Sequence, residues 1–262
     1  MNDRTKRVDI AGISGMFGES VTGKRERDED YIACDEFGNV RVGVLCDGMG
    51  GGQSGDLASE TAARVFITCV RESSGGLAER WSDVLTRHRA LSEAIGNCHE
   101  AIVAMAGGVG LSGSTLTAVV ATYGLEAIES IDLVHIGDSR CYRISHSGAE
   151  ILTDDHSVTG DMVRADYIKI HEIEDTSGKN TLTRNIGDEG SSSADIVSLD
   201  PSGGSRFLLC CDGVWGPLHG SNGMWLADTD PCSNEFARLM VESALERGST
   251  DNCSVLLADL SA

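Results

Sequence analysis

Proline is scarce in this chain: 262 residues contain three prolines and no low-complexity tract. Linkers between domains are usually exposed and rich in proline, glycine or polar residues, and no stretch of that kind divides the sequence. No repeat of solenoid length is present either. Because this length fits one undivided domain, we expect residues 1–262 to form a single domain.

A basic surface and long apolar runs are also missing. Lys and Arg number 21 against 41 Asp and Glu, a formal net charge of −20, which argues against general binding to nucleic acid or anionic membranes. No run approaches the roughly 18 apolar residues of a membrane span, and no apolar signal core follows the charged residues 1–7. We expect a cytoplasmic protein with no nucleic-acid or membrane partner, and we further expect a monomer.

The nine cysteines include no Cys-x-x-Cys pair. Several, among them Cys46, Cys210 and Cys253, lie inside apolar runs, where a small buried thiol is the ordinary finding. We expect free, structural cysteines.

One stretch carries the first chemical signal. The apolar run from Val42 to Cys46 is typical of a buried strand, and it ends on Asp47, followed by Gly48 and the glycines at 50–52. Glycine lets the backbone bend sharply and approach a ligand closely, and a carboxylate so placed suits a hard cation. Asp-Gly is also a common turn, so this stretch alone leaves a turn without any ligand as an equal alternative.

The pattern of an acid at the end of an apolar run returns three times. Asp212 follows the run 206–211, Asp138 follows the run 130–136, and Asp251 precedes the run 253–260. Carboxylates brought together by folding repel one another and need a compensating charge. The four acids therefore predict a divalent-metal site; the alternative is a collection of turn and helix-cap acids.

The order of helical and strand-like patterns along the chain predicts helices lying on antiparallel sheets rather than a doubly wound fold. Apolar residues recur at helical spacing over 54–71, 82–105 and 234–246, with Ser82 as the expected N-cap of the second helix. Strands are expected at 31–34, 40–46, 114–122, 131–136, 141–145, 149–152, 206–211 and 253–260, with a loose edge strand within 8–14 and a loop over 215–230. Residues 153–188 are polar and weakly periodic, as functional or mobile loops are.

Eight short motifs stand in a fixed order along the chain. They are Arg-Glu-Arg-Asp-Glu-Asp at 25–30, Asp-Gly-Met-Gly-Gly at 47–51, Gly-Ser-Thr at 113–115, Gly-Asp-Ser-Arg at 137–140, Leu-Thr-Asp-Asp-His-Ser at 152–157, Thr-Leu-Thr-Arg-Asn-Ile-Gly at 181–187, Cys-Asp-Gly-Val at 211–214 and Asp-Asn at 251–252. Together they resemble the metal-dependent protein serine/threonine phosphatases of the PPM, or type 2C, family, especially its bacterial single-domain members. The resemblance covers nearly everything from about Val8 to Leu260.

The resemblance implies an α+β fold, a four-layer α-β-β-α sandwich of two antiparallel sheets flanked by helix pairs, with a flap at about 157–180. It also implies two or three manganese or magnesium ions and a phosphorylated protein substrate, with a Ser/Thr kinase as one candidate. Phosphoserine or phosphothreonine would be hydrolysed by direct attack of a metal-bridging water or hydroxide. Oxygen-only ligands agree with these metals.

Roles for individual residues follow from the matched motifs. Asp47 would bridge two metals, the Gly48 carbonyl would bind one, and Asp212 and Asp251 would hold the other. The catalytic set implied is therefore Asp47, Asp212 and Asp251. Asp138 would share a third metal site with Asp212.

The first motif supplies the remaining roles. Glu29 and Asp30 would act on the metals mainly through water. Arg25 would bind the substrate phosphate, to which its planar guanidinium offers two donors. His135 and His156 are expected to be structural, and Arg140 and Arg184 are expected to make supporting salt bridges.

One position departs from many eukaryotic members: Met49 stands where they carry a histidine proposed as general acid. Two other interpretations remain beside a phosphatase that reverses a bacterial Ser/Thr kinase. One is a catalytically silent adaptor with the same fold; the other is a phosphatase of a partner-switching anti-sigma antagonist.

Overall fold

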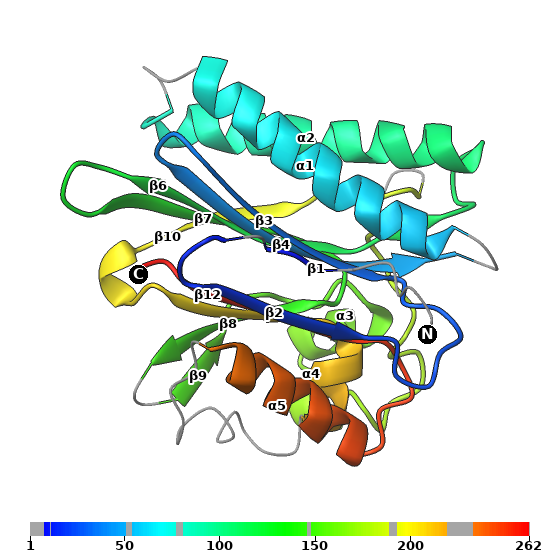
Figure 1. Ribbon diagram of the computed structural model, residues 1–262. Coiled ribbons are helices and arrows are strands. Elements are labelled where there is room, and N and C mark those ends of the chain that lie inside the picture. Colours follow the sequence, from blue (N-terminus) through cyan, green and yellow to red (C-terminus); the bar gives the residue numbers. More distant parts are fainter. Residues whose placement is uncertain are drawn as a thin grey trace, which may run out of the picture.

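The structure is a computed structural model that describes residues 8–10, 12–50, 54–76, 81–145, 148–188, 193–218 and 233–261. Two β-sheets lie face to face, and helices cover the outer face of each sheet (Figure 1). The expected four-layer α-β-β-α sandwich is confirmed.

The first sheet has seven strands in the order β1-β3-β4-β6-β7-β10, with β5 paired to β4. Their bounds are β1 Val8–Asp9, β3 Asp30–Phe37, β4 Val40–Met49, β5 Gly113–Ser114, β6 Leu116–Tyr123, β7 Ile128–Ile136 and β10 Asp195–Leu199. All pairs are antiparallel except the two-residue β1, which runs parallel to β3. The expected edge strand within 8–14 is therefore short and parallel.

The second sheet has five strands in the order β2-β12-β11-β8-β9, all antiparallel. Their bounds are β2 Met16–Val21, β8 Arg140–Ser145, β9 Gly148–Ile151, β11 Arg206–Cys210 and β12 Cys253–Asp259.

Two long helices, α1 Gly55–Gly76 and α2 Val84–Ala106, pack on the first sheet. The N-cap of α2 is Asp83 rather than Ser82, because the Asp83 carboxylate accepts the backbone N–H of Thr86. On the other side, α4 Asp212–Leu218 and α5 Asn234–Glu246 pack against the second sheet (Figure 1). A short α3, Val158–Arg164, and two 3-10 turns, Ile170–Glu172 and Pro201–Gly203, complete the described elements.

Two apolar cores result from this layering. One lies between the first sheet and α1 and α2, and the other lies between the two sheets and continues to α4 and α5. β4 contributes to both cores, Val44 and Cys46 to the first and Leu45 to the second, which explains its unbroken apolar run. The eight described cysteines are free, as expected, and all but Cys69 are buried.

The remaining differences from the expected elements are local. β2 and β10 were not expected, and α4 occupies the start of the loop expected over 215–230, whose later residues lie outside the described ranges. Within those ranges, no helix is both long and apolar enough to cross a bilayer.

Candidate functional site

Five aspartates gather at one end of the two sheets. Asp30 begins β3 and pairs across the ladder with Asp47 near the end of β4. Asp138 follows β7 after one glycine, Asp212 begins α4 two residues beyond the end of β11, and Asp251 lies two residues before β12. The sheets thus bring together acids that are far apart in the sequence.

Burial and neighbouring carboxylates raise the pKa values of four of these acids. Desolvation, then the charges of Asp30 and Asp212, raise the pKa of Asp47 well above its usual value. Desolvation, then Asp212, raises the pKa of Asp138 in the same way. The pKa of Asp212 is raised to about 6 and that of the fully buried Asp30 to about 7, with desolvation again the largest cause. A bound cation would stabilise the charged form of these carboxylates and relieve their mutual repulsion.

Backbone and hydroxyl groups fix the position of Asp47. Its N–H donates to Thr115 Oγ1 at 2.9 Å, and its carbonyl accepts from the N–H of Thr115 at 2.8 Å. Thr115 Oγ1 also shares a hydrogen bond of 2.9 Å with Ser139 Oγ, next to Asp138. One threonine therefore links the backbones that carry two of the acids.

Gly48 is fixed by close packing. Its N–H donates to the Glu29 carbonyl at 3.0 Å, and a Cβ at this position would lie 2.0 Å from the Gly55 carbonyl oxygen. No larger residue fits there without moving the start of α1. The Glu29 carboxylate also lies against Gly55, where a Cβ would be 2.4 Å from Oε1.

Asn252 organises the loop that carries Arg25 and Glu29. Its side-chain oxygen accepts the N–H of Glu29 at 2.9 Å, and its amide donates to the carbonyls of Thr22 at 2.9 Å and Arg27 at 2.8 Å. Three bonds from one side chain thus hold the first motif against the last.

Arg25 reaches the acid cluster directly. Its Nη2 donates to Asp251 Oδ2 at 2.6 Å, and the Arg25 side chain is 53% exposed. Partial burial opposes its charge, but the carboxylate of Asp251 raises the pKa of Arg25 overall. The guanidinium is therefore charged, accessible and adjacent to a candidate ligand.

The segment around Asp138 is anchored by an aromatic and a buried ion pair. Trp215 Nε1 donates to the Asp138 carbonyl at 2.9 Å. The Arg140 guanidinium lies 3.5 Å from the Trp215 ring centroid and forms two bonds, of 2.8 and 2.7 Å, to Asp155. Arg140 has the supporting role expected for it.

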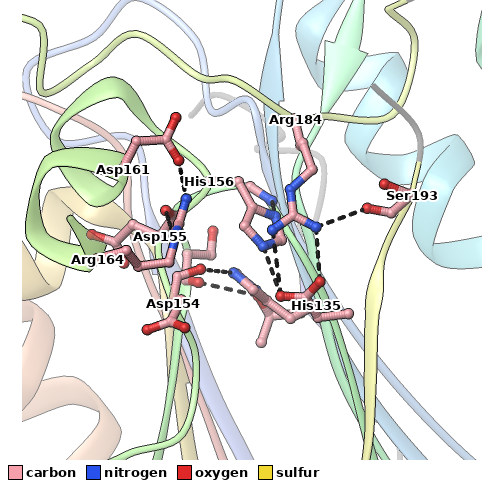
Figure 2. A network of polar contacts seen from close by, with 12 residues as sticks. His135, Asp154, Asp155, His156, Asp161, Arg164, Arg184 and Ser193 are labelled. Atoms are coloured by element: carbon pink, nitrogen blue, oxygen red, sulfur yellow. Dashed lines mark hydrogen bonds and ion pairs between the residues drawn. The ribbon is translucent and has the colours of Figure 1, made fainter. Parts of the chain in front are cut away.

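His156 and Arg184 meet at one carboxylate, that of Asp195. His156 Nε2 lies 3.0 Å from Asp195 Oδ2, and Arg184 Nη1 lies 2.7 Å from Oδ1; Figure 2 shows the two basic side chains together with His135. His156 Nδ1 accepts the N–H of Gly137 at 3.1 Å, so the proton of the neutral ring lies on Nε2. Burial lowers the pKa of His156, and it lowers that of His135 to about 3, so both rings are neutral and structural.

These contacts close the base of the segment 157–180. His156 precedes it and Arg184 follows it, and two backbone bonds cross between its ends: the N–H of Val158 to the Thr181 carbonyl, 2.9 Å, and the N–H of Thr183 to the His156 carbonyl, 2.8 Å. Ile173 inside the segment is 2% exposed and belongs to the core. The segment is therefore attached at its base and at its middle.

A cavity of about 170 Å³ lies where this segment meets the acids. Asp138, Asp212 and Asp251 line one part of it, and Glu174 and Lys179 line another. Glu174 and Lys179 were not singled out from the sequence, because a polar loop carries no periodic signal that shows which side chain turns inward.

The oxygen donors suit magnesium or manganese, whose shells keep water molecules and accept carbonyls. Within the described residues, no three His, Cys, Asp and Glu side chains already surround one point as a complete ligand set. The crowded carboxylates and the raised pKa values nevertheless fit a divalent cation. The predicted residues are thus brought together, with Gly51 and Gly52 of the turn outside the described ranges.

Comparisons with known proteins agree on one family. No family model matches the chain. A serine/threonine phosphatase Stp of Listeria monocytogenes is 27% identical over 226 residues, covering 84% of this chain and 85% of that protein. The crystal structure of a PPM Ser-Thr phosphatase from Mycobacterium smegmatis, solved with cacodylate, is 30% identical with a TM-score of 0.70, covering 95% of this chain and all of that one. The catalytic domain of the phosphatase PstP, solved with two manganese ions, is 25% identical with a TM-score of 0.68, covering 93% and 96%.

Proposed function

The chain belongs to the PPM family of serine/threonine protein phosphatases, and we propose that it hydrolyses phosphoserine and phosphothreonine in proteins with manganese or magnesium bound at its aspartate cluster. The observation that carries the proposal is the convergence of Asp47, Asp138, Asp212 and Asp251 beside Arg25. A silent adaptor is disfavoured because every acid that the motifs predict is retained.

The residues that would hold the metals are those predicted from the motifs. Asp47, the Gly48 carbonyl, Asp212 and Asp251 form the principal set, and Asp138 would complete a third position with Asp212. Glu29 and Asp30 would contribute mainly through water. Bound there, manganese or magnesium supplies an activated water and neutralises charge on the phosphate.

The chain itself supplies binding and orientation. Arg25 offers a fork of donors to two phosphate oxygens, and its contact with Asp251 keeps that fork at the edge of the cluster. Thr115 and Asn252 hold the acids and the Arg25 loop in place, so that phosphate and ligands meet without large rearrangement.

Hydrolysis of a phosphothreonine peptide with manganese, with excess chelator, and after manganese is restored tests the proposal. We expect turnover that chelator abolishes and metal restores. Asp212→Ala should abolish it while the protein stays folded, whereas Glu93→Ala, on the exposed face of α2, should retain it. No turnover by the folded, metal-loaded protein would favour the adaptor.

The identity of the protein substrate is a further part of the proposal. A phosphorylated Ser/Thr kinase is the proposed substrate, and its dephosphorylation can be compared directly with that of a phosphorylated anti-sigma antagonist.

The monomeric state and the mobility of the segment 157–180 stay predictions, which light scattering and hydrogen exchange test. Amides protected throughout that segment would contradict its mobility.

A further inference from the structure

A tight turn at the end of the flap presents Lys179 to the catalytic cavity. The N–H of Thr181 donates to the Gly178 carbonyl at 3.0 Å, and Gly178 has φ +91°, a conformation that favours glycine. The Thr181 carbonyl is in turn bound by the N–H of Val158 at 2.9 Å. Lys179 is therefore held on a closed backbone turn rather than on a free loop.

Glu174 forms the other half of a charged pair in the cavity wall. Lys179 Nζ donates to Glu174 Oε2 at 2.6 Å. The neighbouring Ile173 is buried in the core, and Glu174 lies so close to α4 that a Cβ at Gly216 would be 3.0 Å from its Oε1. Glu174 thus lies beside α4, and its charge also raises the pKa of Asp212, after desolvation and Asp251.

Lys179 is the one cationic side chain among the described residues that line this cavity. The charged residues around it are acids: Asp138, Asp212, Asp251 and Glu174. The Lys179 side chain is 37% exposed, so a solute in the cavity can reach it. Arg25 is not among the lining residues, so Lys179 is a second cation, separate from the one proposed for the phosphate.

We propose that Lys179 is a specificity-determining residue that pairs with an anionic group on the substrate chain beside the phosphorylated residue. In the free protein Glu174 holds the ammonium group, and the substrate anion replaces this carboxylate as its partner. The inference rests on the proposed function and adds a preference to it: phosphopeptides with acidic neighbours over those with basic ones.

The opposite effects of the two partners give a sharp test. A structural ion pair would lose the same stabilisation whichever partner is changed. If Glu174 instead competes with the substrate for Lys179, Glu174→Gln should increase the preference for acidic peptides, whereas Lys179→Glu should reverse it. Lys179→Arg should keep it, because the charge is retained.

The experiment compares kcat/KM for phosphothreonine peptides that differ only in flanking residues, glutamate, alanine or lysine. We expect wild-type protein to favour the glutamate peptide over the lysine peptide by about three- to tenfold, as an exposed ion pair allows, mainly through KM. Lys169→Glu is the matched control, since Lys169 lies on the same flap, is 63% exposed and pairs with Asp166; it should leave the ratio unchanged.

Three outcomes would overturn the inference. Equal losses with all peptides in Lys179→Glu would mean that Lys179 serves the phosphate or the fold, and the same shift in Lys169→Glu would mean a general effect of surface charge. In both cases the phosphatase activity stands. Wild-type protein that turns over none of the peptides with manganese would overturn the proposed function, and this inference with it.

Discussion

The acid cluster should make the chelator-treated protein less stable as pH rises, and Asp30→Asn should remove the part of that dependence that Asp30 contributes. Asp30 is fully buried and pairs with Asp47 across β3 and β4. Desolvation, then the charge of Asp28, raises its pKa from 3.8 to about 7. Asparagine has the same shape but no charge, so the substitution isolates the electrostatic part.

The sign and size follow from linkage. The pKa of Asp30 is higher in the folded chain than in the unfolded chain, so the folded state holds this proton more tightly. The resulting stabilisation is fully present at low pH and is lost as pH rises through about 7. One pKa unit corresponds to about 1.36 kcal/mol, so the loss is at most roughly 4 kcal/mol. His135 acts in the opposite direction: its pKa is lowered to about 3, so its contribution is present above pH 6.5 and is lost as the unfolded chain takes up protons below it.

Urea denaturation of both proteins in chelator, between about pH 5 and about pH 8, measures the effect. The difference between the two curves cancels His135, and we expect the free energy of unfolding of Asp30→Asn to gain on wild type as pH rises, by a few kcal/mol at most. Manganese should restore wild-type stability at the upper pH by mass action. A difference that stays constant with pH would refute the reasoning, because Asp30 would then be charged in the fold without penalty.

Three further substitutions test the supports of the site. Asp155→Ala should cost about 3–5 kcal/mol in denaturation, since it leaves the fully buried Arg140 without its carboxylate, and a cost below about 1 kcal/mol would contradict this. Asp195→Asn should raise amide exchange in the flap more than in α2, because it weakens the contacts that close the flap base; uniform exchange would argue against that role. Gly48→Ala should abolish turnover and lower the melting temperature, because its Cβ would collide with the Gly55 carbonyl, and wild-type values for both would be the contrary result.

Periodic elements could be predicted because the sequence pattern and the burial agree. The helix expected at 82–105 is observed as Val84–Ala106, and the helix expected at 234–246 is observed with those bounds. β2 could not be predicted, because Gly18, Glu19 and Ser20 break the alternation of an apolar strand. Its pairing with β12 and its cover by α5 are tertiary effects that no local pattern contains.

The helix α4 could not be predicted from the sequence for a similar reason. Its seven residues include two glycines and Pro217, which favour a turn. The buried side chains of Val214, Trp215 and Leu218 stabilise the helix instead. At the site, the order of the motifs was enough to predict that the acids converge. The pairing of Glu174 with Lys179 could not be predicted, because it depends on a turn geometry that the sequence does not specify.

Buried thiols lie in both apolar cores, so their chemical modification can report when each core opens. Cys46 and Cys98 lie in the core beneath α1 and α2, whereas Cys141 and Cys210 lie in the core between the sheets. Burial raises the pKa of Cys210 to about 12 and raises that of the other three as well, so thiolate, the reactive form, is scarce in the fold. Alkylation at each site therefore requires its own core to open, so modification of Cys46 and Cys98 reports on one core and modification of Cys141 and Cys210 reports on the other.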